Sequence, residues 1–208
     1  GITAGCNQAF CLAAAALPTA GDEVILRLPF YFNYQMWLEM LGIGLVPLPV
    51  GERDALPDPD VAARLIGPRT RAIVLISPNN PTGATYPAEL IEAFYRLAQR
   101  HGMAVVLDET YKDFRASGAP PHTLFQDPDW PQTLIQLYSF SKAYSLTGYR
   151  VGSIAADLGC ANWEDLMPYA VGAFSLFGLG ALPAGRLGDL WGRRVMMIVM
   201  MRLSLVLP

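Results

Sequence analysis

The chain has 208 residues, a length that suits one domain of ordinary size with a short appendage. Its formal net charge is −3 at pH 7 and no long run carries a single sign, which argues against a nucleic-acid partner. Its three cysteines, Cys6, Cys11 and Cys160, form no Cys-x-x-Cys pair, and their odd number favours a reduced, cytoplasmic setting.

Apolar runs and helix-forming segments alternate along the first 140 residues. We expect the chain to begin at the end of a strand, which leads into a helix over residues 7–17. The further predicted strands span residues 23–28, 44–50, 71–77, 104–107 and 133–138. A helix-like run follows residue 31 and continues to residue 41. Two further helices are predicted over residues 61–66 and 87–99. A glycine-bounded run at 148–152 also has the pattern of a strand. This alternation predicts an α/β fold with a mainly parallel sheet and flanking helices.

Polar residues follow several of these strands, and ligands bind at the carboxyl ends of strands in open α/β sheets. Asp108 comes after four apolar residues, where a buried carboxylate is costly unless it is paired. The segment Ser77-Pro78-Asn79-Asn80-Pro81-Thr82-Gly83 predicts a sharp turn. Near the N-terminus, the turn around Gly5 opens a helix, and its unpaired N–H groups suit either a phosphate or an ordinary helix cap.

The run Ser139-Phe140-Ser141-Lys142 places a lysine between small hydroxyl residues, and Arg150 follows eight positions later. A lysine alone is most often a solvated surface charge. Together with Asp108-Glu109-Thr110-Tyr111 and the turn at 77–83, the run resembles the large domain of the fold-type-I pyridoxal-phosphate (PLP) enzymes, specifically the class I/II aminotransferases. We expect residues 1–157 to form part of such a PLP-binding large domain.

The resemblance implies a role for each of these polar residues. Lys142 would attach the cofactor and later move a proton, and Asp108 would keep the pyridine nitrogen protonated. Asn80 and Tyr111 would donate to the 3′-oxygen, and Tyr31 would stack on the pyridine ring. Residues with N–H, hydroxyl or cationic groups would bind the phosphate: Gly5, Cys6, Asn7, Ser139, Ser141 and Arg150.

Each assignment has an ordinary structural alternative, namely a surface lysine, a helix-capping aspartate, a turn asparagine or a salt-bridged arginine. Phe30, Phe32 and Tyr34, which flank the stacking position, are expected to be core aromatics. His101 and His122 lie in turn-like settings and receive no catalytic role, and no metal site is predicted.

By resemblance, the protein is expected to transfer an amino group from an L-amino acid to a 2-oxo acid, in a family that usually forms homodimers. Other PLP chemistry, such as that of a C–S lyase or a decarboxylase, uses the same lysine and aspartate. An inactive fragment that binds the cofactor or a membrane is a further alternative. The chain begins in mid-pattern, and we expect it to be a fragment. In the family, the region that follows the position of residue 157 supplies an arginine that binds the substrate carboxylate. The sequence after residue 157 does not match that region, so this arginine has no counterpart.

The last fifty residues do not continue this pattern. Residues 166–185 are twenty uncharged residues, long enough to cross a bilayer. The following residues, 185–194, resemble the loop between the second and third membrane helices of the major facilitator superfamily of transporters. We therefore expect 158–208 to be an apolar helical tail, derived from a transporter reading frame joined near 158–165, with possible membrane contact. The alternative is a buried helical hairpin.

Overall fold

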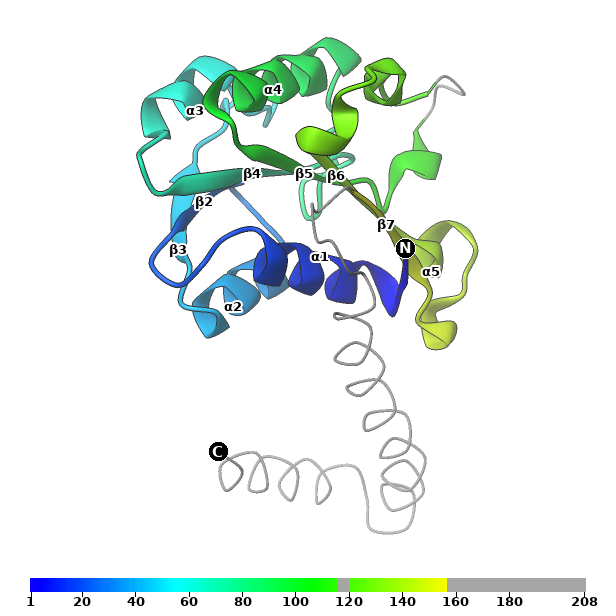
Figure 1. Ribbon diagram of the computed structural model, residues 1–208. Coiled ribbons are helices and arrows are strands. Elements are labelled where there is room, and N and C mark those ends of the chain that lie inside the picture. The colour runs from blue at the N-terminus through cyan, green and yellow to red at the C-terminus, as the bar shows by residue number, and fades with distance from the viewer. Residues whose placement is uncertain (116–119, 157–208) are drawn as a thin grey trace, which may run out of the picture. The chain divides into compact units, whose positions relative to one another are not determined.

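The computed structural model describes residues 1–115 and 120–156 of the chain (Figure 1). The expected apolar tail, its junction near 158–165 and its resemblance to a transporter lie outside the described residues. Within the described ranges, no helix combines the length and the apolar character that crossing a bilayer requires.

A mixed sheet forms the centre of the described part of the chain. Its seven strands lie in the order β1 (Ile2–Thr3), β7 (Gly152–Ala155), β6 (Leu134–Ser139), β5 (Ala104–Asp108), β4 (Thr70–Ile76), β2 (Glu23–Arg27) and β3 (Gly44–Leu48). The pairings from β6 to β3 are all parallel, whereas β7 runs antiparallel to both β6 and β1. The prediction of a mainly parallel sheet is therefore confirmed for the strands that the sequence pattern identifies most strongly.

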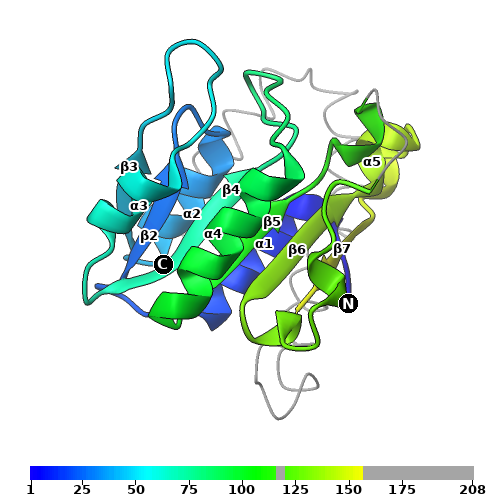
Figure 2. The same ribbon diagram turned by 90° about the horizontal axis from the view of Figure 1, so that it is seen from above.

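Helices cover both faces of this sheet (Figures 1 and 2). One face carries α1 (Gly5–Ala16) and α2 (Phe32–Met40), and the opposite face carries α3 (Pro59–Leu65) and α4 (Ala88–His101). Figure 2 shows α4 lying over the central strands. Since parallel strands need crossover connections, the helices that make those connections are the ones that shield the sheet.

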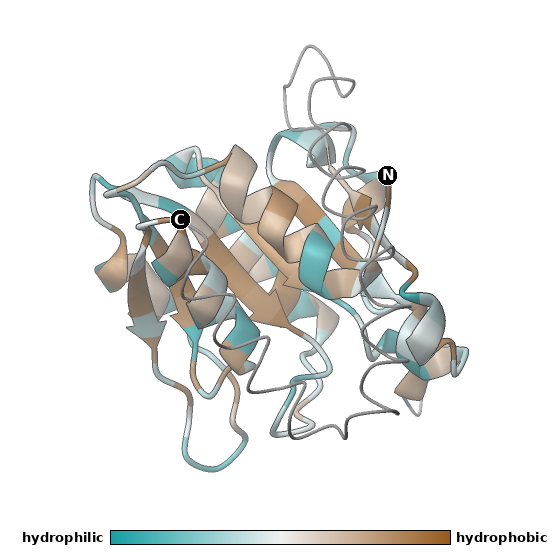
Figure 3. Cartoon of the chain, turned by 90° about the horizontal axis from the view of Figure 1, so that it is seen from below, coloured by the Kyte–Doolittle hydropathy of each residue, from teal (hydrophilic) through white to brown (hydrophobic). Residues whose placement is uncertain are grey.

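The core has two layers because the central strands bury both of their faces. In β4, Val74 and Ile76 belong to the cluster under α1 and α2, whereas Ile73 and Leu75 belong to the cluster under α3 and α4. Figure 3 shows the resulting continuous apolar strands beneath the helices. Each fully buried aliphatic side chain contributes about 1.5–3 kcal/mol relative to an exposed one. This burial explains why the uninterrupted apolar run at 72–76 predicts a strand so well.

Most predicted boundaries shift by one or two residues, and two of the differences have a local explanation. Helix α3 begins two residues earlier than expected, because the Asp58 side chain caps it by accepting from the Asp60 N–H at 2.8 Å and Pro59 occupies its first turn. The run at 148–152 is not a strand throughout. Residues Thr147–Tyr149 form a 3₁₀ turn, Arg150 has φ of +53°, and strand β7 begins only at Gly152.

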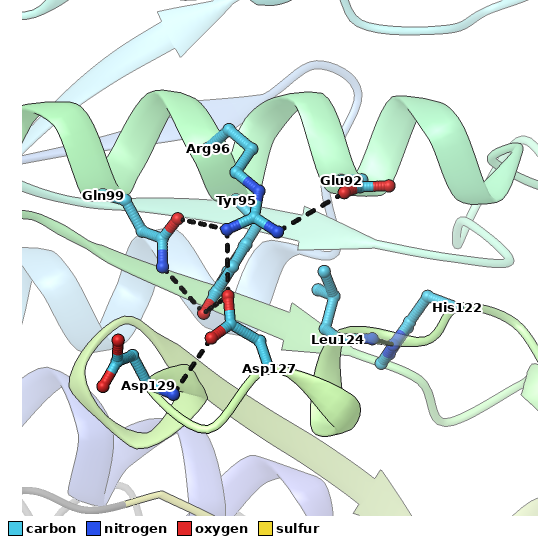
Figure 4. Close-up of polar contacts among 8 residues, drawn as sticks. All are labelled: Glu92, Tyr95, Arg96, Gln99, His122, Leu124, Asp127 and Asp129. Carbon is cyan, nitrogen blue, oxygen red and sulfur yellow. Dashed lines mark hydrogen bonds and ion pairs between the residues drawn. The ribbon is translucent and has the colours of Figure 1, made fainter.

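Asp127 connects the segment that precedes β6 to α4 through hydrogen bonds (Figure 4). The Asp127 carboxylate accepts from the Tyr95 hydroxyl at 3.2 Å, from Arg96 Nη1 at 2.9 Å and from the Asp129 N–H at 3.0 Å. The Asp129 N–H, followed by Arg96 and Tyr95, holds the pKa of Asp127 below its usual value. Figure 4 also shows that Gln99 completes this network from the next turn of α4.

This network predicts an acid-dependent part of the stability. Because the pKa of Asp127 is lower in the folded chain than in the unfolded one, its contribution is present above pH about 4 and is lost as the pH falls through the folded pKa. We expect Asp127→Asn to lower the free energy of unfolding at pH 7 and to flatten its decline in acid. Urea unfolding between pH 2 and pH 7 measures this, with the exposed Glu52→Gln as control. Parallel pH profiles for Asp127→Asn and wild type would contradict the prediction.

Candidate active site

One cavity of about 270 Å³ lies at the carboxyl edge of the parallel strands. Strands β2, β4, β5 and β6 all end there because they are parallel, so that the turns following them meet at the same edge. All the predicted site residues except Gly5 line the cavity: Cys6, Asn7, Tyr31, Asn80, Asp108, Tyr111, Ser139, Ser141, Lys142 and Arg150. Gly5 lies directly behind it, next to Arg150.

Asp108 supplies a buried carboxylate to this cavity. Its side chain belongs to a residue only 6% exposed, and its two oxygens accept from different donors. The Thr110 N–H donates to Oδ1 at 2.8 Å and the Tyr34 hydroxyl donates to Oδ2. These two donors offset part of the cost of burying the carboxylate and fix its orientation towards the cavity.

Tyr34 is therefore more than the core aromatic that the sequence predicts. Its ring does pack in the core, with a centroid 4.4 Å from that of Phe10, but its hydroxyl reaches Asp108. Burial, with the Asp108 carboxylate as the next cause, raises the pKa of Tyr34 well above its usual value, so the hydroxyl remains a donor at physiological pH. The same two causes raise the pKa of the Cys6 thiol, which therefore stays neutral beside Asp108.

Removing the Tyr34 hydroxyl should lower the ligand affinity of the cavity while the protein still folds. We expect Tyr34→Phe to reduce the affinity for PLP, the cofactor that the sequence resemblance implies, by about tenfold, because a buried carboxylate that loses one donor is held less firmly. Tyr95→Phe is a matched control, since Tyr95 also donates to an aspartate but belongs to the opposite face of the sheet. Fluorescence titration with PLP measures both variants, and equal affinities would contradict the role given to Tyr34.

The turn at the start of α1 has the features of an anion site. Gly5 has φ of +76°, and a Cβ at this position would lie 2.5 Å from Arg150 Nη2, so only glycine allows the guanidinium to approach the helix N-terminus. The N-cap residue, Ala4, offers no side chain to cap α1. Helix N-terminal N–H groups and an adjacent cation both favour a bound anion.

Two serines of the lysine motif connect to this turn. Arg150 Nη1 donates to Ser141 Oγ at 3.2 Å and to the Thr147 carbonyl at 3.2 Å, while the Ser141 N–H donates to Ser139 Oγ at 3.2 Å. Both serines are buried, with exposures of 4% and 5%. The hydroxyl groups and the guanidinium thus form one hydrogen-bonded cluster on the wall of the cavity.

Lys142 extends from the short helix α5 (Phe140–Ala143), which directly follows β6. The residue is exposed, and its Nζ lies 6.0 Å from the centroid of the Tyr111 ring. Tyr31, which is 38% exposed, lines the same cavity from the N-terminus of α2. An amine, an aromatic face and a buried carboxylate therefore border one space.

Sequence reasoning missed several residues of this site. Thr110, Asn33 and Thr147 line the cavity, and Gly152 lies against the backbone of Gly5. Thr110 could have been suspected from its place between the predicted Asp108 and Tyr111. Gly152 carries no local signal, because its importance arises from pairing with Thr3, which is far away in the sequence.

The described part of the chain is an open α/β sheet whose carboxyl edge holds a lysine, an aspartate and a helix N-terminus beside an arginine. The family model for class I and II aminotransferases matches residues 2–170, and the chain belongs to this family. The match extends past the boundary expected at residue 157, and that boundary stays a prediction. The comparisons give no support to the transporter resemblance of the tail.

Curated relatives and solved structures agree with this membership. The aspartate/prephenate aminotransferase of Thermus thermophilus is 36% identical over 160 residues, which cover 73% of this chain and 39% of that protein. The arginine–pyruvate transaminase AruH of Pseudomonas aeruginosa is 34% identical, over 79% of this chain and 42% of that protein. A structure of a Thermus thermophilus aspartate aminotransferase variant superposes with a TM-score of 0.70 at 34% identity, covering 76% of this chain and 43% of that one. The chain thus spans about two fifths of the length of these relatives.

Proposed function

We propose that the protein acts as a PLP-dependent aminotransferase, which transfers an amino group from an L-amino acid to a 2-oxo acid. One observation carries this proposal: Lys142, Asp108 and Tyr111 come from the ends of two neighbouring strands and line a single cavity. Membership of the aminotransferase family and the names of the relatives support the same reaction.

The residues at the cavity fit the phosphate group of PLP. Arg150 occupies the space that a Cβ on residue 5 would need, and no side chain caps the start of α1. The guanidinium, the helix N-terminus and the hydroxyl groups of Ser139 and Ser141 together supply the donors that a phosphate dianion requires. Cys6 and Asn7 would contribute N–H groups of the first helical turn.

The residues on the far side of the cavity fit the ring of the same cofactor. An ionised carboxylate offers about four acceptor positions, so Asp108, which accepts from the Thr110 N–H and the Tyr34 hydroxyl, can also accept from a protonated pyridine nitrogen. Asn80 and Tyr111 carry donors for the 3′-oxygen, and Tyr31 has a flat face for stacking. When bound, PLP supplies the electron sink for the substrate Cα.

Lys142 is the group proposed to move the proton. Its amine borders the cavity beside Tyr111, and an amine within reach of the substrate would remove the proton from Cα and deliver it to the cofactor carbon on the other side of the substrate nitrogen. The amine would also hold the cofactor covalently. An amino acid and a 2-oxo acid are the proposed substrates, and the homodimer usual in the family is the proposed assembly.

A half-reaction tests this function directly. The purified chain is loaded with PLP and then mixed with L-aspartate, L-arginine or L-phenylalanine, and mass spectrometry detects the products. Aminotransfer yields pyridoxamine 5′-phosphate and the matching 2-oxo acid. A decarboxylase would release an amine and carbon dioxide, and a lyase would release a thiol from a thioether amino acid. A chain that binds PLP but yields no product would overturn the proposed reaction for this chain.

A further inference from the structure

Arg27 is a fully buried cation that none of the proposed chemistry uses. It is the last residue of β2, and its exposed fraction is 0%. Its neighbour Ile25 packs in the cluster under α3 and α4, so the alternation along the strand directs Arg27 to that same face, away from the cavity. Its Cζ lies 5.9 Å from the centroid of the Tyr86 ring on that face.

No carboxylate in the described part of the chain pairs with this guanidinium. None of the ion pairs within residues 1–115 and 120–156 includes Arg27, and its Nε has no hydrogen-bond partner there. Burial lowers the pKa of Arg27 as a result. Burying a charge without an opposite charge costs stability, so other interactions must offset that cost.

The hydrogen bonds of Arg27 connect three separate loops. Nη1 donates to the Pro29 carbonyl at 3.0 Å, and Nη2 donates to the Ala55 carbonyl and, at 3.5 Å, to Thr82 Oγ1. Thr82 in turn donates from its hydroxyl to Asn79 Oδ1 at 2.9 Å. A planar fork with several donors can connect such partners at once, whereas the single ammonium of a lysine cannot do so with the same geometry.

Two of these three loops carry residues of the cavity. Tyr31 follows Pro29 by two positions, and Asn80 lies between Asn79 and Thr82 in the turn. We propose that Arg27 is a positioning residue, which sets the spacing between the loop that carries Tyr31 and the loop that carries Asn80. The importance of this spacing for PLP rests on the proposed function.

The test replaces Arg27 by lysine, which keeps the charge and loses the fork. Arg71→Lys is the matched control, since Arg71 is an exposed arginine whose guanidinium does pair with a carboxylate, that of Asp22, at 3.1 Å. We expect Arg27→Lys to weaken PLP binding by about tenfold while the cofactor still attaches to Lys142, and we expect Arg71→Lys to bind as wild type. Arg27→Met, which also loses the charge, should weaken binding at least as much.

Hydrogen–deuterium exchange of the chain without ligand separates this proposal from the proposed function. Arg27→Lys should speed exchange in peptides covering 28–34 and 77–86, and leave a peptide covering 103–108 unchanged. Faster exchange in all three peptides would mean general destabilisation, and unchanged exchange in the first two would overturn the positioning role. If the wild-type chain itself does not bind PLP, the proposed function fails while the exchange result still decides the role of Arg27.

Discussion

Lys142→Ala is expected to abolish the covalent capture of PLP and to reduce amino-group transfer by about 10³-fold or more, because no other amine borders the cavity among the described residues. The chain has only two lysines, so the result can be assigned without ambiguity. Lys112 is the other one, and its Nζ lies 4.6 Å from the centroid of the Tyr138 ring instead of lining the cavity.

Borohydride reduction after PLP addition, followed by peptide mapping, measures this effect. The wild-type chain and Lys112→Ala should carry one pyridoxyl group on Lys142, and Lys142→Ala should carry none. A label that persists in Lys142→Ala, or that lies mainly on Lys112 in the wild type, would refute the assignment of the attachment site. Thermal unfolding of each variant checks that the substitutions leave the fold intact.

The strands of the central sheet were predictable because burial on both faces leaves a local trace. The run at 72–76 is uninterrupted and apolar, and the structure places it in β4 with both faces covered. Strand β7 lacks such a trace, since its sequence is only Gly-Ser-Ile-Ala. Its existence depends on pairing with two strands, β6 on one side and β1 on the other, and β1 lies at the opposite end of the sequence.

The cavity was predictable for a related reason. Residues that follow parallel strands must meet at one edge of the sheet, so the order of the motifs was sufficient to bring Asp108, Lys142 and Asn80 together. The supporting residues could not be found in this way. Tyr34 has the helical spacing of a core residue and Arg27 has the pattern of a strand residue, and only the folded chain brings their polar atoms to Asp108 and Thr82.

Gly152 is another residue whose role depends on contacts with residues that are distant in the sequence. A Cβ at this position would lie 2.6 Å from the carbonyl carbon of Gly5, 2.7 Å from its Cα and 2.8 Å from the Tyr138 carbonyl oxygen. All three atoms belong to the backbone, so no side chain can rotate away. Gly152 pairs with Thr3 on one side and Ser139 on the other, which means that any displacement separates β7 from both neighbours.

We therefore expect Gly152→Ala to lower the free energy of unfolding by about 2–4 kcal/mol and to weaken PLP binding by more than about tenfold. The loss of affinity follows because the clash displaces Gly5, whose backbone supports the approach of Arg150 to the start of α1. Gly148→Ala is the matched control, since a Cβ there meets no atom within 4 Å. Urea unfolding and PLP titration of both variants decide the matter. If Gly152→Ala matched Gly148→Ala in both measurements, the turn at Gly5 would not depend on its contact with Gly152.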